Sequence, residues 1–192
     1  MTLKDGRFTP NTHIPLSMDI AHFFLQCFWF YLPISMANQS AGFANKLHLP
    51  GNIPIWLWGL GCNKTWHYLY AAPLCAILKL LLQQIFPSLN HWASINDSDK
   101  VNILLLGLAQ GWGVVLGDWS KSFVKRRLGI PPGGKFWPWD QTDYVFGAVM
   151  LQIPLIGWIG WNYLLALLVI ALVIHPGGNW IGWRLGFRKT KW

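Results

Sequence analysis

Long apolar runs separated by short polar segments make up most of the chain. Five runs are long enough to form helices, at residues 20–37, 66–86, 101–117, 144–160 and 161–175. A helix that crosses a bilayer needs about 20 mainly apolar residues, with a range of about 17–25. The first two runs meet this length, and the third lies at its short end. The pattern therefore predicts helices that span a membrane.

The last two runs are almost continuous, from Tyr144 to His175. A stretch of this length is too long for one span. Its "GWIGWN" segment (157–162) gathers Gly, which favours breaks, with Trp, which favours membrane interfaces. We therefore expect one helix to end and another to begin there. The predicted fold is an all-α integral membrane protein with a bundle of about five transmembrane helices.

Composition agrees with a membrane protein. Of the 192 residues, 53% are hydrophobic and only 11% are charged, which is unlike a soluble domain. The three Cys form no CxxC pair, so the sequence suggests neither a disulfide framework nor a zinc site. Residues 1–18 are polar and lack the apolar core of a cleaved signal peptide. We expect a single membrane-embedded domain over 1–192.

The net charge of +8 could indicate a nucleic-acid partner, but the positions of the cations argue otherwise. With five spans, eleven of the fifteen Lys and Arg fall on the C-terminal side and three on the other, while Lys79 lies within a span at snorkelling distance from its outer end. The positive-inside rule then places the C-terminal side in the cytoplasm. We expect a plasma-membrane protein without nucleic acid, and the oligomeric state stays open.

A polar run, "DWSKSFVKRRLGIPPGGKFWPWDQTD" (118–143), connects the third and fourth predicted spans. It holds three of the seven acidic residues and five of the fifteen Lys and Arg. We expect the third helix to continue to about Leu128, where Gly129 and Pro131 favour its end. Four polar residues then share one helical face through their i, i+3, i+4, i+7 spacing: Asp118, Lys121, Ser122 and Lys125.

Two more carboxylates, Asp140 and Asp143, follow Pro138, which suits the first position of the fourth helix. Three carboxylates among cations, without His or Cys, favour hard oxygen ligation of Mg²⁺ that shares phosphate oxygens with a substrate. Alternatively, Asp140 and Asp143 only complement the helix dipole. The chain would then be a non-catalytic membrane protein that binds anionic lipid or a partner through its basic loop.

The loop between the first two spans, "GLGCNKTWHY" (59–68), places Lys64 and Thr65 directly before the second span. A helix N-terminus there could bind phosphate. A P-loop is excluded, because Trp58 and Asn63 stand where that motif needs Gly. Asn38, at the end of the first span, is expected at the same level.

Four segments together resemble one known family: "PISMAN" (33–38), "NKTW" (63–66), the run 117–143 and "HPGGNWIGWRLGF" (175–187). On these the chain resembles the CDP-archaeol synthases (CTP:archaetidate cytidylyltransferases), which are related to bacterial CDP-diacylglycerol synthases. The run 117–143 is similar to the family pattern GD-x-x-KSF-x-KRR…PG…P-x-DQ-x-D. The resemblance implies a five-helix, Mg²⁺-dependent membrane enzyme with a cytoplasmic site. Its reaction joins a lipid phosphate to the α-phosphorus of CTP and yields a CDP-lipid and pyrophosphate.

The resemblance also implies residue roles, with archaetidate or phosphatidate left open as acceptor. Asp118, Asp140 and Asp143 would hold Mg²⁺ and, with Lys121, form the catalytic set. The substrate-binding residues would be Asn38, Lys64, Thr65, Ser120, Ser122, Lys125, Arg126, Arg127, Lys135 and Gln141. The chain departs from the family's GDGKTWRG segment at Cys62 and His67, which replace an Asp and an Arg.

Two other classes fit less well. A CDP-alcohol phosphotransferase would carry a DG…AR…G…D…D run, and none occurs in the chain. A transporter would predict internal repeats, and the five runs form no clear repeat.

Overall fold

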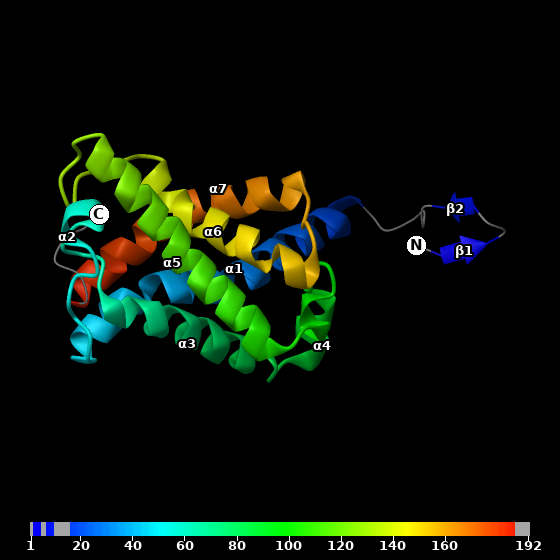
Figure 1. Cartoon of the computed structure of the whole chain (residues 1–192). Coiled ribbons are helices and arrows are strands. Elements are labelled where there is room, and N and C mark those ends of the chain that lie inside the picture. The colour runs from blue at the N-terminus through cyan, green and yellow to red at the C-terminus, as the bar shows by residue number, and fades with distance from the viewer. Residues whose placement is uncertain (1, 5–6, 10–15, 187–192) are drawn as a thin grey trace.

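The structure, a computed structural model, describes residues 2–4, 7–9 and 16–186. Five long helices lie side by side as a bundle (Figure 1). They are α1 (Leu16–Lys46), α3 (Trp66–Gln83), α5 (Ile103–Arg127), α6 (Trp139–Ile156) and α7 (Trp161–Arg184). Each predicted apolar run contributes the main part of one of them. The basic residues Arg188, Lys189 and Lys191, which were counted on the predicted cytoplasmic side, lie outside the described residues.

Among the described residues, three helices are long and apolar enough to cross a membrane. They are Ile20–Lys46 within α1, Ile103–Arg127 and Trp161–Arg184. The helices α3 and α6 have 18 residues each, which corresponds to about 27 Å. Their apolar character is lowered by polar residues such as Lys79 in α3 and Asp140 in α6. Three of the five predicted spans are therefore candidate spans by length and composition.

Shorter elements occupy the connections. The helices α2 (Leu57–Leu60), α4 (Pro87–Trp92) and the 3-10 helix η1 (Ser98–Lys100) were not predicted. At the N-terminus, β1 (Thr2–Lys4) and β2 (Arg7–Thr9) pair antiparallel, away from the bundle in Figure 1. The bundle itself is all-helical, as expected, and this short hairpin outside it was not predicted.

The long helices begin and end at recognisable residues. At the start of α5, Asn102 Oδ1 accepts a hydrogen bond from the Leu104 amide at 2.9 Å. The helix ends at Arg127, and Gly129 follows with φ +72°. Gly157 and Gly160, both with positive φ, separate α6 from α7, close to the expected break. Pro138 precedes α6 as its N-cap, one position before the place predicted for it.

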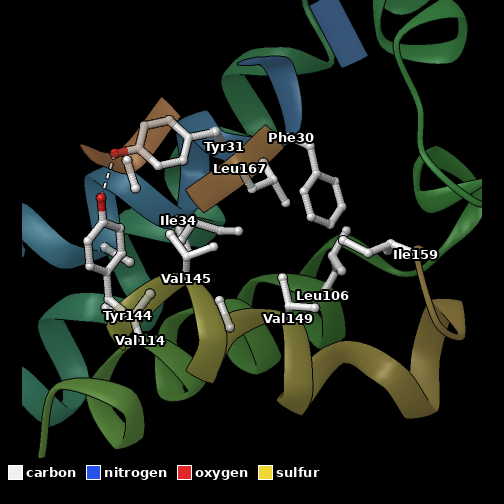
Figure 2. Close-up of a cluster of buried hydrophobic side chains, with 14 of the residues drawn as sticks. Phe30, Tyr31, Ile34, Leu106, Val114, Tyr144, Val145, Val149, Ile159 and Leu167 are labelled. Carbon is white, nitrogen blue, oxygen red and sulfur yellow. Dashed lines mark hydrogen bonds between the residues drawn. The ribbon is translucent and has the colours of Figure 1, made fainter. Parts of the chain in front are cut away.

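The core lies where α1, α5, α6 and α7 meet (Figure 2). Its large buried side chains include Ile34, Val114, Val145 and Leu167, which are all fully enclosed. The hydroxyl groups of Tyr31 and Tyr144 share a hydrogen bond of 2.6 Å in this interior. The pairing satisfies two polar groups that would otherwise be costly to bury. Tyr144 directly follows the predicted catalytic Asp143, so this hydrogen bond links the start of α6 to α1.

The helix α5 contacts its neighbours through glycines on two faces. A Cβ atom at Gly107 or Gly111 would come within 2.4 Å or 2.2 Å of α3. On the other face, a Cβ atom at Gly113 would lie 2.5 Å from the Gly147 carbonyl oxygen, and one at Gly117 would lie 2.2 Å from that of Asp143. The backbones of α5 and α6 are therefore in direct contact. Such small-xxx-small spacing is typical of close helix pairs in membranes.

Candidate active site

Three carboxylates converge on the ammonium group of Lys121. Asp118 follows Gly117 on α5, while Asp140 and Asp143 lie in the first turns of α6. The Nζ atom of Lys121 lies 2.9 Å from Asp143 Oδ2, 3.2 Å from Asp118 Oδ1 and 3.3 Å from Asp140 Oδ1. The glycine contact between α5 and α6 sets this arrangement, because it brings Gly117 against the backbone of Asp143.

Two more lysines complete the cluster. Lys64 Nζ lies 2.5 Å from Asp118 Oδ2, and Lys125 Nζ lies 2.9 Å from Asp140 Oδ1. Three carboxylates thus face three ammonium groups, so their formal charges cancel. Charges that are removed from water need such partners, since an unpaired buried charge is strongly destabilising. We call these six residues the Lys–Asp cluster: Lys64, Asp118, Lys121, Lys125, Asp140 and Asp143.

The connection between α5 and α6 is tied to the Lys–Asp cluster. Lys125 Nζ donates to the Gly134 carbonyl oxygen at 2.5 Å, and the Phe136 amide donates to Asp140 Oδ2 at 2.6 Å. These backbone partners lie between Gly129 and Pro138, in a segment for which no backbone contacts to the Lys–Asp cluster were predicted. In Figure 1 this connection and α2 lie at one end of the bundle, and α4 lies at the other end.

The two carboxylates of α6 experience different surroundings. Asp140 accepts hydrogen bonds from Lys125 Nζ at 2.9 Å and from the Phe136 amide at 2.6 Å. Asp143 is the carboxylate with the weakest support, since among the described residues neither of its oxygens accepts a hydrogen bond and Lys121 is its ion-pair partner.

The donor set was tested against the predicted Mg²⁺. Within residues 2–4, 7–9 and 16–186, no group of three or more His, Cys, Asp or Glu is arranged as a metal site. The Lys121 ammonium group stands among the three carboxylates. Three hard carboxylates, one of them lacking hydrogen-bond donors, nevertheless have the chemistry that Mg²⁺ prefers. The residues fit the ion in donor type and charge, and Mg²⁺ stays a prediction.

Arg126 offers the clearest candidate for phosphate binding. Its Nε and Nη1 atoms are buried and donate to no acceptor among the described residues. A Cβ atom added to Gly61 would lie 3.9 Å from its Nε, so the guanidinium group lies beside the loop that carries Lys64. An unpaired guanidinium group suits a phosphate, which it can bind with two parallel hydrogen bonds.

Three other predicted substrate-binding residues are close in sequence but differ in surroundings. The Gln141 Oε1 atom is buried without a hydrogen-bond donor in the described part of the chain. Lys135 is exposed in the α5–α6 connection. Arg127 is also exposed, and its guanidinium group lies 4.8 Å from the centre of the Phe123 ring.

Four predicted residues lie apart from the cations or use their polar groups elsewhere. Ser120 is on the exposed face of α5. The Ser122 hydroxyl donates to the Asp118 carbonyl oxygen at 2.8 Å. Thr65 Oγ1 pairs with His67 Nε2 at 3.2 Å. In the described part of the chain, Asn38 makes no hydrogen bond or ion pair with the Lys–Asp cluster.

The two departures from the resemblance differ in environment. His67 is fully buried at the start of α3, whereas Cys62 is exposed in the preceding loop, with its thiol 3.6 Å from Asn63 Oδ1. Neither side chain contacts the carboxylates of the Lys–Asp cluster in the described part of the chain. Sequence reasoning missed the glycine contacts of α5, which the spacing of Gly113 and Gly117 could have indicated.

Comparisons with known proteins identify the family of this chain. The family model for CarS-like CDP-archaeol synthases matches residues 20–192. The chain is 30% identical to a CDP-archaeol synthase of Pyrococcus furiosus, with 89% of this chain and 99% of that protein covered. It is 36% identical to one of Methanoregula boonei, with 69% of this chain and 81% of that protein covered.

A solved structure has a similar fold. It belongs to an intramembrane enzyme for the biosynthesis of archaeal membrane lipids, and it matches with a TM-score of 0.61 at 24% identity over 79% of this chain and 90% of that chain. The fold and the apolar helices together indicate an integral membrane protein. Since the family model covers nearly the whole bundle together with the Lys–Asp cluster, the chain belongs to the CDP-archaeol synthase family.

Proposed function

We propose that the Lys–Asp cluster is the active site of a cytidylyl transfer from CTP to a membrane lipid phosphate. Members of this family are CTP-dependent nucleotidyltransferases, and this chain is an enzyme of that class. The observation that supports the proposed site is the convergence of three carboxylates and three ammonium groups at one end of the bundle. Phosphoryl chemistry depends mainly on positioning and charge stabilisation, which such a cluster supplies.

The reaction needs few groups from the protein. An oxygen of the lipid phosphate attacks the α-phosphorus of CTP, the bond from that phosphorus to the bridging oxygen breaks, and pyrophosphate leaves. The attacking oxygen is already anionic, so no general base is required. Arg126 at the end of α5 lies beside the loop that carries Lys64. These two cations are proposed to hold the triphosphate. Fixed cations at this position stabilise the negative charge that builds up on the transferred group.

The metal is part of the proposal. Asp118, Asp140 and Asp143 would hold Mg²⁺, which when bound would neutralise the phosphate oxygens of the nucleotide. The carboxylates themselves are held in place by Lys64, by Lys125 and by the Phe136 amide. These contacts orient the donors before any ligand arrives.

The acceptor is proposed from the relatives. The similar curated proteins are named CDP-archaeol synthases, so archaetidate is the first acceptor to test and phosphatidate the second. The two lipids share the reacting phosphate and differ in their apolar chains. Apolar contacts distinguish such groups weakly, by about 1–3 kcal/mol per methylene-sized difference.

The orientation is likewise proposed. Eight of the Lys and Arg in the described residues lie at the end of the bundle that carries the Lys–Asp cluster: Lys46, Lys64, Lys121, Lys125, Arg126, Arg127, Lys135 and Arg184. The positive-inside rule would place this end in the cytoplasm, where CTP is found. We also propose that α3 and α6 cross the membrane with the three candidate spans, because they run the length of the bundle beside α5 (Figure 1).

The decisive experiment measures pyrophosphate release by detergent-purified protein with CTP and Mg²⁺. Archaetidate and phosphatidate are supplied separately. We expect Asp143→Asn to lower turnover by at least about 100-fold, because it removes a carboxylate while keeping the shape. The matched control is Asp97→Asn, at an exposed aspartate near the other end of the bundle, which should keep full activity.

The opposite result is equally clear. Folded wild-type protein that binds anionic lipid but releases no pyrophosphate with either acceptor would contradict the synthase function. It would favour the non-catalytic lipid-binding protein instead.

A further inference from the structure

The position of Lys121 differs from that of the other cations at this end of the bundle. Its ammonium group lies within 2.9–3.3 Å of one oxygen from each of the three carboxylates. Its side chain is only 12% exposed. A lysine that waits for phosphate would direct its charge toward open space rather than into a group of carboxylates. Lys121 instead lies where the carboxylates would hold a metal ion.

We propose that Lys121 is an internal counter-cation: it occupies the metal position in the free enzyme and leaves it when the metal and the nucleotide bind. The inference rests on the proposed function, because it concerns how the same carboxylates receive Mg²⁺. It gives Lys121 a specific role within the catalytic set that the resemblance implied.

Distances support an exchange rather than coexistence. Mg²⁺ binds oxygen at about 2.0–2.1 Å, closer than the ammonium group now lies, and it would repel a cation among the same oxygens. The partners of the carboxylates also differ. Asp118 keeps Lys64, and Asp140 keeps Lys125 and the Phe136 amide. Asp143 has only Lys121 as an ion-pair partner among the described residues, so Asp143 needs a replacement cation as soon as Lys121 moves.

The charge balance indicates when the exchange takes place. The Lys–Asp cluster is neutral as it stands, so a free divalent cation would leave it with two excess positive charges. A triphosphate brings negative charge to the same place. The free site should therefore bind Mg²⁺ weakly, and CTP should strengthen that binding. By linkage, Mg²⁺ must strengthen CTP binding by the same factor.

The first test measures Mg²⁺ binding by calorimetry with and without CTP, in the full chain and in Lys121→Met. This substitution keeps an unbranched apolar stem and removes the charge. We expect Mg²⁺ alone to bind the variant at least about tenfold more tightly than the wild type, with a smaller effect of CTP. Lys125→Met is the matched control. Lys125 lies one helical turn after Lys121 and also contacts Asp140, so the substitution removes the same charge from the same cluster. Its affinity for Mg²⁺ should change less.

A second test follows Lys121 in the wild-type protein, and so does not depend on a variant that folds. An amine-reactive reagent is applied with and without saturating Mg²⁺ and CTP together, and labelling is read by mass spectrometry. Release from the three carboxylates should increase labelling of Lys121. The exposed Lys100, which pairs with Asp97 near the other end of the bundle, should be labelled equally in both conditions.

The outcomes separate two failures. Wild-type protein that binds neither Mg²⁺ nor CTP would contradict the proposed function itself. Wild-type protein that binds both, with Lys121→Met no tighter than Lys125→Met for Mg²⁺ and with unchanged labelling of Lys121, would overturn only the exchange.

Discussion

Arg126 is the clearest case in which a single side chain is unfavourable for the free protein and useful for a ligand. Two of its guanidinium nitrogens are buried without an acceptor in the described part of the chain. A buried donor without a partner costs about 1–3 kcal/mol. We therefore expect Arg126→Met to unfold at the same or a higher temperature than the wild type without CTP. The stabilisation by CTP in the same thermal melts should be largely lost.

The neighbouring Arg127 provides the comparison. It is exposed and lies over the Phe123 ring, so Arg127→Met removes the same charge without touching the buried position. This variant should keep its stabilisation by CTP. A lower melting temperature of Arg126→Met without nucleotide would show that its guanidinium group has a partner already, and would remove the argument for phosphate binding.

Helical spacing predicted which residues share the polar face of α5, but it did not predict which groups their side chains contact. Asp118, Ser122 and Lys125 do share a buried face of α5, as their spacing indicated. The hydroxyl of Ser122 is nevertheless used by the carbonyl one turn back, a local bond that competes with any ligand. The direction of Lys121 could not be predicted, because it depends on where α6 places Asp140 and Asp143.

Among the elements, α5 is the helix whose packing sets the site. Gly117→Ala would place a methyl group 2.2 Å from the Asp143 carbonyl oxygen, so α5 and α6 would have to separate. Overpacking of this kind costs typically about 1–3 kcal/mol. We expect a lower melting temperature and a loss of pyrophosphate release, because Asp118 and Asp143 move apart. Thermal melts and the activity assay measure the two effects.

Gly177 in α7 is the matched control for that prediction. A Cβ atom at Gly177 meets nothing within 4 Å. Alanine at an unhindered helical position is favoured over glycine by about 0.5–1 kcal/mol, so Gly177→Ala should be neutral or stabilising. Equal destabilisation by both substitutions would mean that helix contacts at Gly117 are not the cause.

At the other end of the bundle, the pair of His91 and Asp99 connects α4 to η1, with 2.7 Å between Nδ1 and Oδ2. Although burial acts to raise it, hydrogen bonds from His91 and Ser94 hold the pKa of Asp99 below its ordinary value of 3.8. A depressed carboxyl pKa contributes stability above the ordinary value, and the contribution disappears as pH falls below it.

Asp99→Asn should therefore lower the melting temperature at pH 7 by about 2 °C, the size expected for a partly exposed pair. The difference from the wild type should shrink as the pH falls below 3.8 and disappear once it has passed through the lowered pKa of Asp99. Activity at pH 7 should be unchanged, because the pair lies far from the Lys–Asp cluster along the bundle (Figure 1). A difference that persists at low pH would argue against the carboxylate as the source.

For the molecule as a whole, the native cysteines allow the proposed orientation to be measured. Cys62 is exposed at the end that carries the Lys–Asp cluster, whereas Cys27 is buried. In intact cells, a membrane-impermeant maleimide should label Cys62 only after permeabilisation. Lys100→Cys, which places a thiol near the opposite end, should be labelled without it. The reverse pattern would invert the topology.

Hydropathy predicted the approximate positions of the long helices, although only three of them are candidate spans among the described residues. The C-terminal end of α1 was predicted less well. The apolar run ends at residue 37, but the helix continues through a polar segment to Lys46. That extension buries Ser40 and Ala44 against the bundle, a tertiary contact without a signature in local hydrophobicity. The small elements α2, α4 and η1 escaped prediction because each is a single turn or two in a connection.

The meeting of Gly113 and Gly147 has a genetic consequence. A suppressor mutation usually restores a crowded contact by shrinking the residue on the facing side. Here both residues are already glycine, and each would place a Cβ atom within 2.5 Å of the other's carbonyl oxygen. In a selection for function, a loss caused by a larger residue at either position should have no compensating partner across the contact. Revertants should map to the altered codon itself.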